Sequence, residues 1–243
     1  KYKDFPYDLS IIVTGNDIKE YFRVLMLALS QIYPELSEKT RHIPHGMVRL
    51  PEGKMSSRTG KVKTAEWLLD TAKNKLQKSY PEMAEETADK VAIAGVKYAL
   101  LRSSIGSDII FDIDNSLSFE GDSGPFLQYT YSRTQSILAK FENLNLIFEF
   151  KLKIKNLKLE NEELALLRHL YKYPEVLHEA TEQFAPNLVC NFLFELAQKY
   201  NTFYSKHRVI GDQTHFRLAL TSTTGIVLKS GLNILGIEAP ERM

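Results

Sequence analysis

Residues 125–141, PFLQYTYSRTQSILAKF, predict a helix of four or five turns and set the fold class of this chain. Proline suits the first turn of a helix, where its missing N–H group would have no partner in any case. We therefore expect a mainly α-helical fold around this segment. At 3.6 residues per turn, one stripe of the helix carries apolar side chains that suit a core, namely Leu127, Tyr131, Leu138 and Phe141. A second stripe carries Phe126, Tyr129, Arg133 and Ile137.

The second stripe has two interpretations. Two aromatic rings and an arginine can stack on bases and bind phosphate in single-stranded RNA. Helical aromatics at this spacing are more often core residues, because an amphipathic helix buries one of its faces. Spacing alone leaves both interpretations open.

Helical patterns continue on both sides of this segment. Upstream, one helix is predicted to begin at Ala65 and end near Tyr80, and Pro81 with its acidic neighbours opens another. Pro174 and Pro186 mark starts or kinks among the downstream helices. These downstream helices are expected at residues 160–182, 186–205 and 212–231.

The first part of the chain has a different pattern. Residues 8–15, DLSIIVTG, predict a buried strand that ends in a turn, and residues 17–32 predict an amphipathic helix. The β-prone run at 47–50 predicts a short strand, and residues 109–113 a short extended segment. One βα unit and a short strand cannot close a doubly wound sheet. We therefore expect the chain to be a truncated or proteolysed segment of a longer protein.

A cationic loop follows the run at 47–50. Residues 53–61, GKMSSRTGK, hold three cations, three hydroxyl side chains and two glycines. Cations and hydroxyls donate hydrogen bonds to phosphate, and glycine lets the backbone approach closely, so the loop suits a clamp for a triphosphate. Composition alone favours an ordinary solvated turn. The P-loop pattern is excluded, because no glycine stands five residues before Gly53 or Gly60.

Composition narrows the class of protein. The 243 residues are 44% hydrophobic and 25% charged, which predicts a soluble globular chain of one large or two small domains. A net charge of +1 is too balanced to argue for nucleic acid, although local basic patches decide that affinity. Cys190, in an apolar context, predicts a buried thiol, and His42 and His45 lack the neighbours that a metal site needs. No signal peptide or membrane span is evident, so a cytoplasmic protein is expected.

Four strings resemble segments of class I aminoacyl-tRNA synthetases, and they occur in order along the chain. KMSSR at 54–58 resembles the KMSKS signature, a mobile loop that holds the phosphates of ATP. HGMV at 45–48 is similar to the adenine-side strand of arginyl-tRNA synthetases. SFEGDSGPFLQY at 118–129 and GLNILGIEAPERM at 231–243 resemble the entry to that family's anticodon-binding domain and its C-terminal end. The chain therefore resembles the C-terminal part of an arginyl-tRNA synthetase.

The resemblance implies a three-part organisation. Residues 1–62 would be the C-terminal part of the class I catalytic domain, which is the second half of a Rossmann-type α/β nucleotide-binding domain. Residues 63–117 would form a helical connecting region that contacts the tRNA stem. Residues 118–243 would form an α-helical bundle that binds the anticodon. The expected fold is therefore mainly α.

The resemblance also implies the reaction of an arginine–tRNA ligase. Arginine attacks the α-phosphate of ATP, which gives arginyl-adenylate and pyrophosphate, and the arginyl group then passes to the 3′ end of tRNA(Arg). Catalysis of such a step is mainly positioning and stabilisation of phosphate charge, and Mg²⁺ accompanies ATP without a metal bound by the protein itself. The implied partners are tRNA(Arg), arginine and ATP, and a monomer is expected.

Three sets of residues receive roles from the resemblance. The catalytic set, expected to contact pyrophosphate, is Lys54, Ser56, Ser57 and Arg58. The ATP-binding set is Gly46, Met47, Val48, Lys54 and Lys61. The anticodon set is Phe126, Tyr129, Arg133 and Met243.

The sequence departs from the family pattern at several positions. Ser57 replaces the second lysine of KMSKS, and we expect Arg58 or Lys61 to supply the missing charge. Ile18 stands where many relatives carry a polar residue that could contact substrate. Phe126 replaces a common tyrosine, so its ring can stack but cannot donate a hydrogen bond.

The HIGH signature of class I enzymes does not occur in these residues, so we expect this chain alone not to activate arginine. Two alternatives stay open. One is a non-catalytic, stand-alone tRNA-binding module whose cationic loop is a relic. The other is a helical protein-interaction domain without an RNA role, which predicts no salt-sensitive RNA binding.

Overall fold

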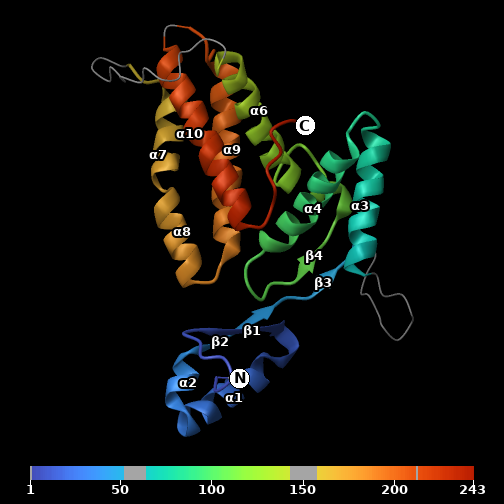
Figure 1. The fold of residues 1–243 in the computed structure, drawn as a ribbon, viewed down its shortest axis with the longest axis vertical. Coiled ribbons are helices and arrows are strands. Elements are labelled where there is room, and N and C mark those ends of the chain that lie inside the picture. The colour runs from blue at the N-terminus through green and yellow to red at the C-terminus, as the bar shows by residue number, and fades with distance from the viewer. Residues whose placement is uncertain (1, 52–63, 143–157, 212) are drawn as a thin grey trace. The chain divides into compact units, whose positions relative to one another are not determined.

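The computed structural model describes residues 2–51, 64–142, 158–211 and 213–243, and these are mostly helical (Figure 1). The chain forms two compact units. The first comprises residues 1–55 and 103–111, and the second comprises residues 56–102 and 112–243. The mainly α prediction is confirmed, whereas the division at residues 62 and 117 stays a prediction.

The first unit contains a βαβ arrangement. Strand β1 (Ser10–Gly15) pairs in parallel with β2 (Thr40–His45), in a register that runs from Ser10 opposite Thr40 to Gly15 opposite His45. Parallel strands need a crossover, and helices supply it here. The crossover consists of η1 (Asn16–Ile18), α1 (Lys19–Ile32) and α2 (Pro34–Glu38).

The strand and the helix expected at 8–32 are confirmed, but the strand is not buried. Ile12 and its register partner His42 lie on the face that α1 covers, where Phe22 stacks on the His42 ring at 4.0 Å between centroids. Ile11 and Val13 point to the opposite face and are 43% and 61% exposed. The expectation of a buried strand is therefore wrong, because the described part of this sheet has one uncovered face.

The first unit also contains a second pair of strands. Strand β3 (Val48–Arg49) pairs in parallel with β4 (Ile109–Ile110). The short strand predicted at 47–50 and the extended segment at 109–113 thus pair with each other.

The second unit begins with two paired helices, α3 (Ala65–Ser79) and α4 (Glu85–Leu101). The expected start of the second helix at Pro81 is wrong, because residues 81–83 form a turn in which the Met83 N–H donates to the Tyr80 carbonyl at 3.0 Å. The short α5 (Ile113–Ser116) leads towards α6 (Gly124–Glu142), the helix predicted from Pro125. A Cβ atom on Gly124 would lie 2.3 Å from the Ala94 carbonyl oxygen, so glycine permits α4 and α6 to meet there.

The remaining helices form a bundle with α6 (Figure 1). The single helix expected at 160–182 is two helices, since Pro174 starts a new one. Pro186 starts a helix as predicted. The helices are α7 (Asn161–Tyr171), α8 (Tyr173–Glu182), α9 (Pro186–Lys206) and α10 (Thr214–Ile234).

The bundle core contains the predicted stripe of α6. Leu127, Tyr131 and Phe141 are buried, and Leu138 packs against the same cluster. Ile137, which the helical spacing places with the second stripe, is also buried in this core. Cys190 is fully buried as expected, and burial raises the pKa of its thiol to about 12. No helix in the described ranges is long and apolar enough to cross a membrane.

Candidate nucleic-acid interface

Two tyrosines and an arginine meet at the surface of the bundle. Tyr129 and Arg133 lie one turn apart on α6, and Tyr204 lies in the last turn of α9. The Arg133 Cζ atom is 4.8 Å from the Tyr129 ring centroid and 5.3 Å from that of Tyr204. The two tyrosines are 41% and 42% exposed. A guanidinium between two accessible rings can bind phosphate while the rings stack on unpaired bases. We call these three residues the cation–π cluster.

Hydrogen bonds fix the guanidinium of the cation–π cluster. Arg133 Nη1 donates to Asn201 Oδ1 at 2.5 Å, and Asn201 Nδ2 donates to Thr130 Oγ1 at 3.1 Å. Arginine offers five N–H donors, and this bond uses one of them, so others can still reach a ligand. A guanidinium held in place loses less conformational entropy when it binds phosphate.

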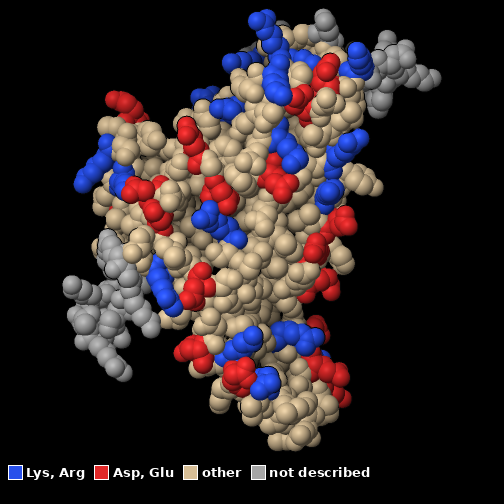
Figure 2. All heavy atoms as spheres, turned by 180° about the vertical axis from the view of Figure 1, so that it is seen from behind, with Lys and Arg blue, Asp and Glu red and all other residues tan. Residues whose placement is uncertain are grey.

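Charged side chains lie at the end of the bundle where α6 and α9 finish. Lys140 lies in the last turn of α6, and Lys206, in the last turn of α9, is paired with Glu162 at 2.6 Å. Figure 2 shows Lys and Arg side chains gathered towards the end of the bundle where these helices finish, with Asp and Glu among them. Local basic charge of this kind attracts the RNA backbone even though the whole chain is nearly neutral.

The structure brings together only part of the predicted anticodon set. Tyr129 and Arg133 are in contact, but Phe126 turns towards the core, where its ring meets Phe194 edge-on at 5.8 Å. Tyr204 is not among the residues predicted from the sequence, and its spacing of four from Tyr200, which is fully buried, indicates a core face and not a binding surface. The contact between α6 and α9 that joins Tyr204 to Arg133 is not encoded in spacing.

Met243 ends a tail that α6 holds. Gln128 Nε2 donates to the Glu238 carbonyl at 2.7 Å, and Ser132 Oγ donates to the Pro240 carbonyl at 2.6 Å. Because Gln128 and Ser132 are one turn apart, the tail runs along α6 next to the stripe of Tyr129 and Arg133. Met243 itself is 38% exposed.

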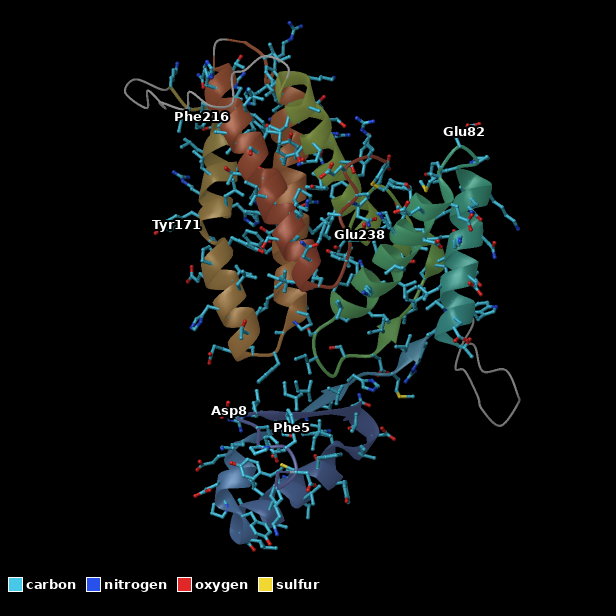
Figure 3. All side chains as sticks on the ribbon, viewed as in Figure 1. Phe5, Asp8, Glu82, Tyr171, Phe216 and Glu238 are labelled. Carbon is cyan, nitrogen blue, oxygen red and sulfur yellow. The ribbon has the colours of Figure 1, made fainter. Side chains whose placement is uncertain are left out.

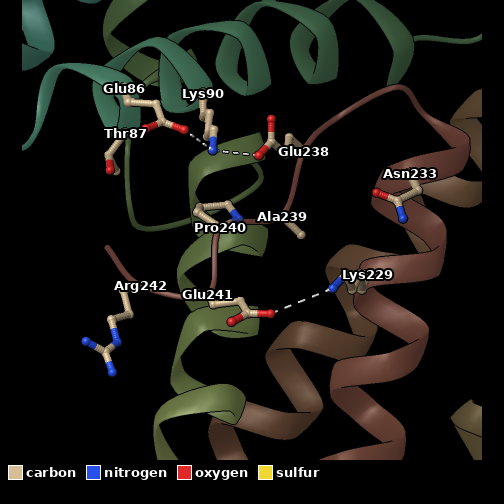
Figure 4. A pocket seen from close by; sticks show the side chains of 10 residues that line it. All are labelled: Glu86, Thr87, Lys90, Lys229, Asn233, Glu238, Ala239, Pro240, Glu241 and Arg242. Carbon is tan, nitrogen blue, oxygen red and sulfur yellow. Dashed lines mark hydrogen bonds and ion pairs between the residues drawn. The ribbon is translucent and has the colours of Figure 1, made fainter.

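A cleft of about 420 Å³ lies beside this tail, between α4 and α10 (Figure 4). Lys90 bonds to Glu238 at 2.6 Å and to Glu86 at 2.8 Å, and these carboxylates raise the pKa of the lysine. Lys229 approaches Glu241 to 3.9 Å. Acidic and basic side chains thus alternate around the cleft, which does not have the positive character of a phosphate site.

The predicted ATP-binding strand lies in the first unit. The Met47 N–H donates to Asp108 Oδ1 at 2.9 Å, and its carbonyl accepts from the Ile109 N–H at 2.9 Å. Backbone groups alternate in direction along a strand, so those of Val48 point away from β4. A Cβ atom on Gly46 would lie 1.8 Å from the Ser107 carbonyl oxygen, which explains glycine at this position.

The remaining predicted residues lie outside the described ranges. These are the cationic-loop residues Lys54, Ser56, Ser57, Arg58 and Lys61. Of the two histidines, His42 contacts Thr14 Oγ1 at 2.8 Å, and His45 Nδ1 lies 2.9 Å from the Gly46 carbonyl. Within the described parts of the chain, no three His, Cys, Asp or Glu side chains converge to hold a metal ion.

The chain is similar to known proteins in sequence and in fold. Residues 127–243 match the family model described as DALR anticodon binding domain. These residues are therefore similar in sequence to an anticodon binding domain. Over its whole length the chain is 34% identical to the arginine–tRNA ligase of Parabacteroides distasonis and 33% identical to that of Phocaeicola vulgatus. It spans 43% and 42% of those two proteins, so it corresponds to the C-terminal part of arginine–tRNA ligases.

Solved structures agree. The arginyl-tRNA synthetase of Thermus thermophilus superposes with a TM-score of 0.81 at 26% identity, covering 97% of this chain and 41% of that one. A methionyl-tRNA synthetase of Mycobacterium tuberculosis gives a TM-score of 0.61 at 19% identity, covering 98% of this chain and 43% of that one, which shows a shared fold. The resemblance to arginyl-tRNA synthetases is confirmed, and the residues that match the family model carry the cation–π cluster on α6 and α9.

Proposed function

We propose that this chain is the C-terminal portion of an arginine–tRNA ligase, and that its anticodon binding domain binds the anticodon loop of tRNA(Arg) through the cation–π cluster. The observation that supports this most is Arg133 between two exposed tyrosine rings. Anticodon bases are unpaired and can leave the helical stack, so two ring faces offer them stacking positions. The guanidinium meanwhile neutralises a phosphate of the same loop.

The rest of the reaction is proposed from the family. The ligase would join arginine to ATP as arginyl-adenylate, release pyrophosphate, and transfer the arginyl group to tRNA. The backbone of Val48 would face the adenine, and Lys54, Ser56, Ser57, Arg58 and Lys61 would bind the phosphates together with the Mg²⁺ that accompanies ATP. A cytoplasmic monomer suits this role. Because no HIGH signature occurs in residues 1–243, we infer that this chain alone does not activate arginine, and ATP–pyrophosphate exchange by it would overturn that inference.

Binding measurements test the anticodon proposal. The chain is titrated with a tRNA(Arg) transcript at several salt concentrations, and with a transcript that differs only in its anticodon. We expect weaker binding of the altered transcript, and we expect Arg133→Met to lower the salt slope by roughly one phosphate contact. Arg168→Met, an exposed arginine on α7, is the matched control. Equal binding of both transcripts by the unaltered chain would contradict anticodon recognition, and no binding would contradict an RNA role.

A further inference from the structure

Two more aromatic rings continue the cation–π cluster away from α9. The Phe119 ring meets Tyr129 edge-on, with 6.3 Å between centroids and 77° between planes. Tyr80 meets Phe119 in the same manner at 5.2 Å and 86°. Tyr80 is the C-cap residue that directly follows α3, and Phe119 lies in the segment before α6. The rings therefore form a continuous series from α9, across α6, to the end of α3.

The Tyr80 side chain is much more exposed than the tyrosines in the core of the second unit. It is 46% exposed, whereas tyrosines that serve the core of this unit, such as Tyr98 and Tyr131, are 0% and 2% exposed. In an edge-to-face contact one ring uses only its edge, so a face of the Tyr80–Phe119 pair is left for another planar group. Unpaired bases are the planar groups that stack on such rings without regard to their sequence.

The charges near Tyr80 distinguish base stacking from phosphate binding. Glu82 lies in the turn between α3 and α4 (Figure 3), and Glu120 follows Phe119 and is exposed. Lys78 in the last turn of α3 is the cation next to them in sequence, so two carboxylates and one ammonium group leave no net positive charge to bind a phosphate at this end of the series. The cation of the series is Arg133, at the other end. Contact at Tyr80 is thus expected to be through ring faces, with little effect of salt.

We propose that Tyr80 and Phe119 form an additional stacking site, which binds an unpaired base of the same RNA loop that the cation–π cluster binds. The inference rests on the proposed anticodon binding and extends it to the helices that precede the bundle. Both residues lie outside residues 127–243, which match the anticodon binding family model. The platform for the loop is then shared between the anticodon binding domain and the α3–α4 pair of the same compact unit.

The test measures binding of an RNA hairpin that carries the tRNA(Arg) anticodon loop. Tyr80→Leu is expected to weaken binding about five-fold or more, as the loss of one base-stacking contact does. The salt slope should stay as in the unaltered chain, because no phosphate contact is lost. Tyr80→Trp and Tyr80→Phe keep a ring and should restore the affinity. Tyr171→Leu is the matched control, since Tyr171 is 88% exposed on α7 (Figure 3).

The outcomes distinguish the additional stacking site from the proposed anticodon binding. Unchanged affinity of Tyr80→Leu, with weakened binding by Arg133→Met, would overturn the additional site and leave anticodon binding in place. Failure of Tyr80→Phe and Tyr80→Trp to restore the affinity would also overturn it, because stacking would not be the cause. No binding of the hairpin by the unaltered chain would overturn both proposals. Circular dichroism melts of every variant confirm that each one is folded as the unaltered chain is.

Discussion

The two compact units bury their apolar side chains to different degrees. In the second unit, large side chains from several helices are completely buried, among them Leu127, Leu166, Leu193 and Leu228, each 0% exposed. In the first unit, α1 keeps Phe22 at 9% exposure but leaves Val24, Leu27 and Ile32 at 62%, 63% and 68%. Parallel sheets are normally covered on both faces, and β1–β2 is not covered in this way in the described chain. The second unit, through its helical bundle, should therefore contribute most of the free energy of unfolding.

The contrast extends to charged groups. Glu163 of α7 is completely buried and bonds to Arg217 of α10 at 2.8 Å, while its second oxygen accepts the Glu160 N–H at 2.8 Å. In the first unit, Glu20 and Arg23 pair at the same distance of 2.8 Å with side chains 73% and 78% exposed. Water screens the second pair and not the first, so equal distances correspond to unequal energies.

Breaking the buried pair should have the largest effect. Arg217→Met leaves the Glu163 carboxylate buried without its cation, which is expected to lower the free energy of unfolding by about 3–5 kcal/mol. Arg23→Met, the matched change in the first unit, should lower it by about 0–1 kcal/mol. Urea denaturation followed by far-UV circular dichroism measures both. Adding Glu163→Gln to Arg217→Met should recover part of the loss, and similar losses from both single variants would contradict the contrast between the units.

A pair of leucine truncations compares the two units without charge. Leu193→Ala removes a fully buried side chain that lies against Gly231 of α10, and should cost about 2–5 kcal/mol of unfolding free energy. Leu27→Ala makes the same chemical change at a position 63% exposed, and should cost less than about 0.5 kcal/mol. The measurement is again urea denaturation. A large loss for Leu27→Ala would mean that further polypeptide or a second copy covers α1 in solution.

The helix starts and core positions of the bundle can be predicted largely from local sequence. The residues of its proposed binding surface can be predicted only in part. Helix starts at Pro125 and Pro186 and the buried stripe of Leu127 and Tyr131 follow from proline geometry and the 3.6-residue period. The same period groups Phe126 with Tyr129, yet Phe126 packs towards Phe194 because α9 approaches that side of α6. The side of α6 on which α9 packs is a tertiary property, and a local sequence pattern does not predict it.

The first unit shows the same limit for strands. The pattern of residues 8–15 predicts a strand correctly, because β-branched residues favour extended backbone. An apolar run cannot tell how many faces of its sheet are covered, so the exposure of Ile11 and Val13 could not be predicted. The pairing of 48–49 with 109–110 joins segments that are far apart in sequence, and only the fold reveals that Asp108 bonds to Met47 and to Arg49.

The smallest expected effect concerns acid and one carboxylate of the bundle. Glu162 accepts hydrogen bonds from Lys206 Nζ at 2.6 Å and contacts His207 Nε2 at 3.0 Å, and these partners lower its pKa from 4.5 to about 2. A carboxylate with a lowered pKa stabilises the fold above its unfolded value, and this stabilisation is lost as pH falls from about 4.5 towards 2. Glu162→Gln should therefore make the fall of Tm over that range shallower than in the unaltered chain. Lys206→Met should give an intermediate slope, because His207 still contacts the carboxylate, whereas parallel Tm curves for all three proteins would show that Glu162 titrates alike in the folded and unfolded chain.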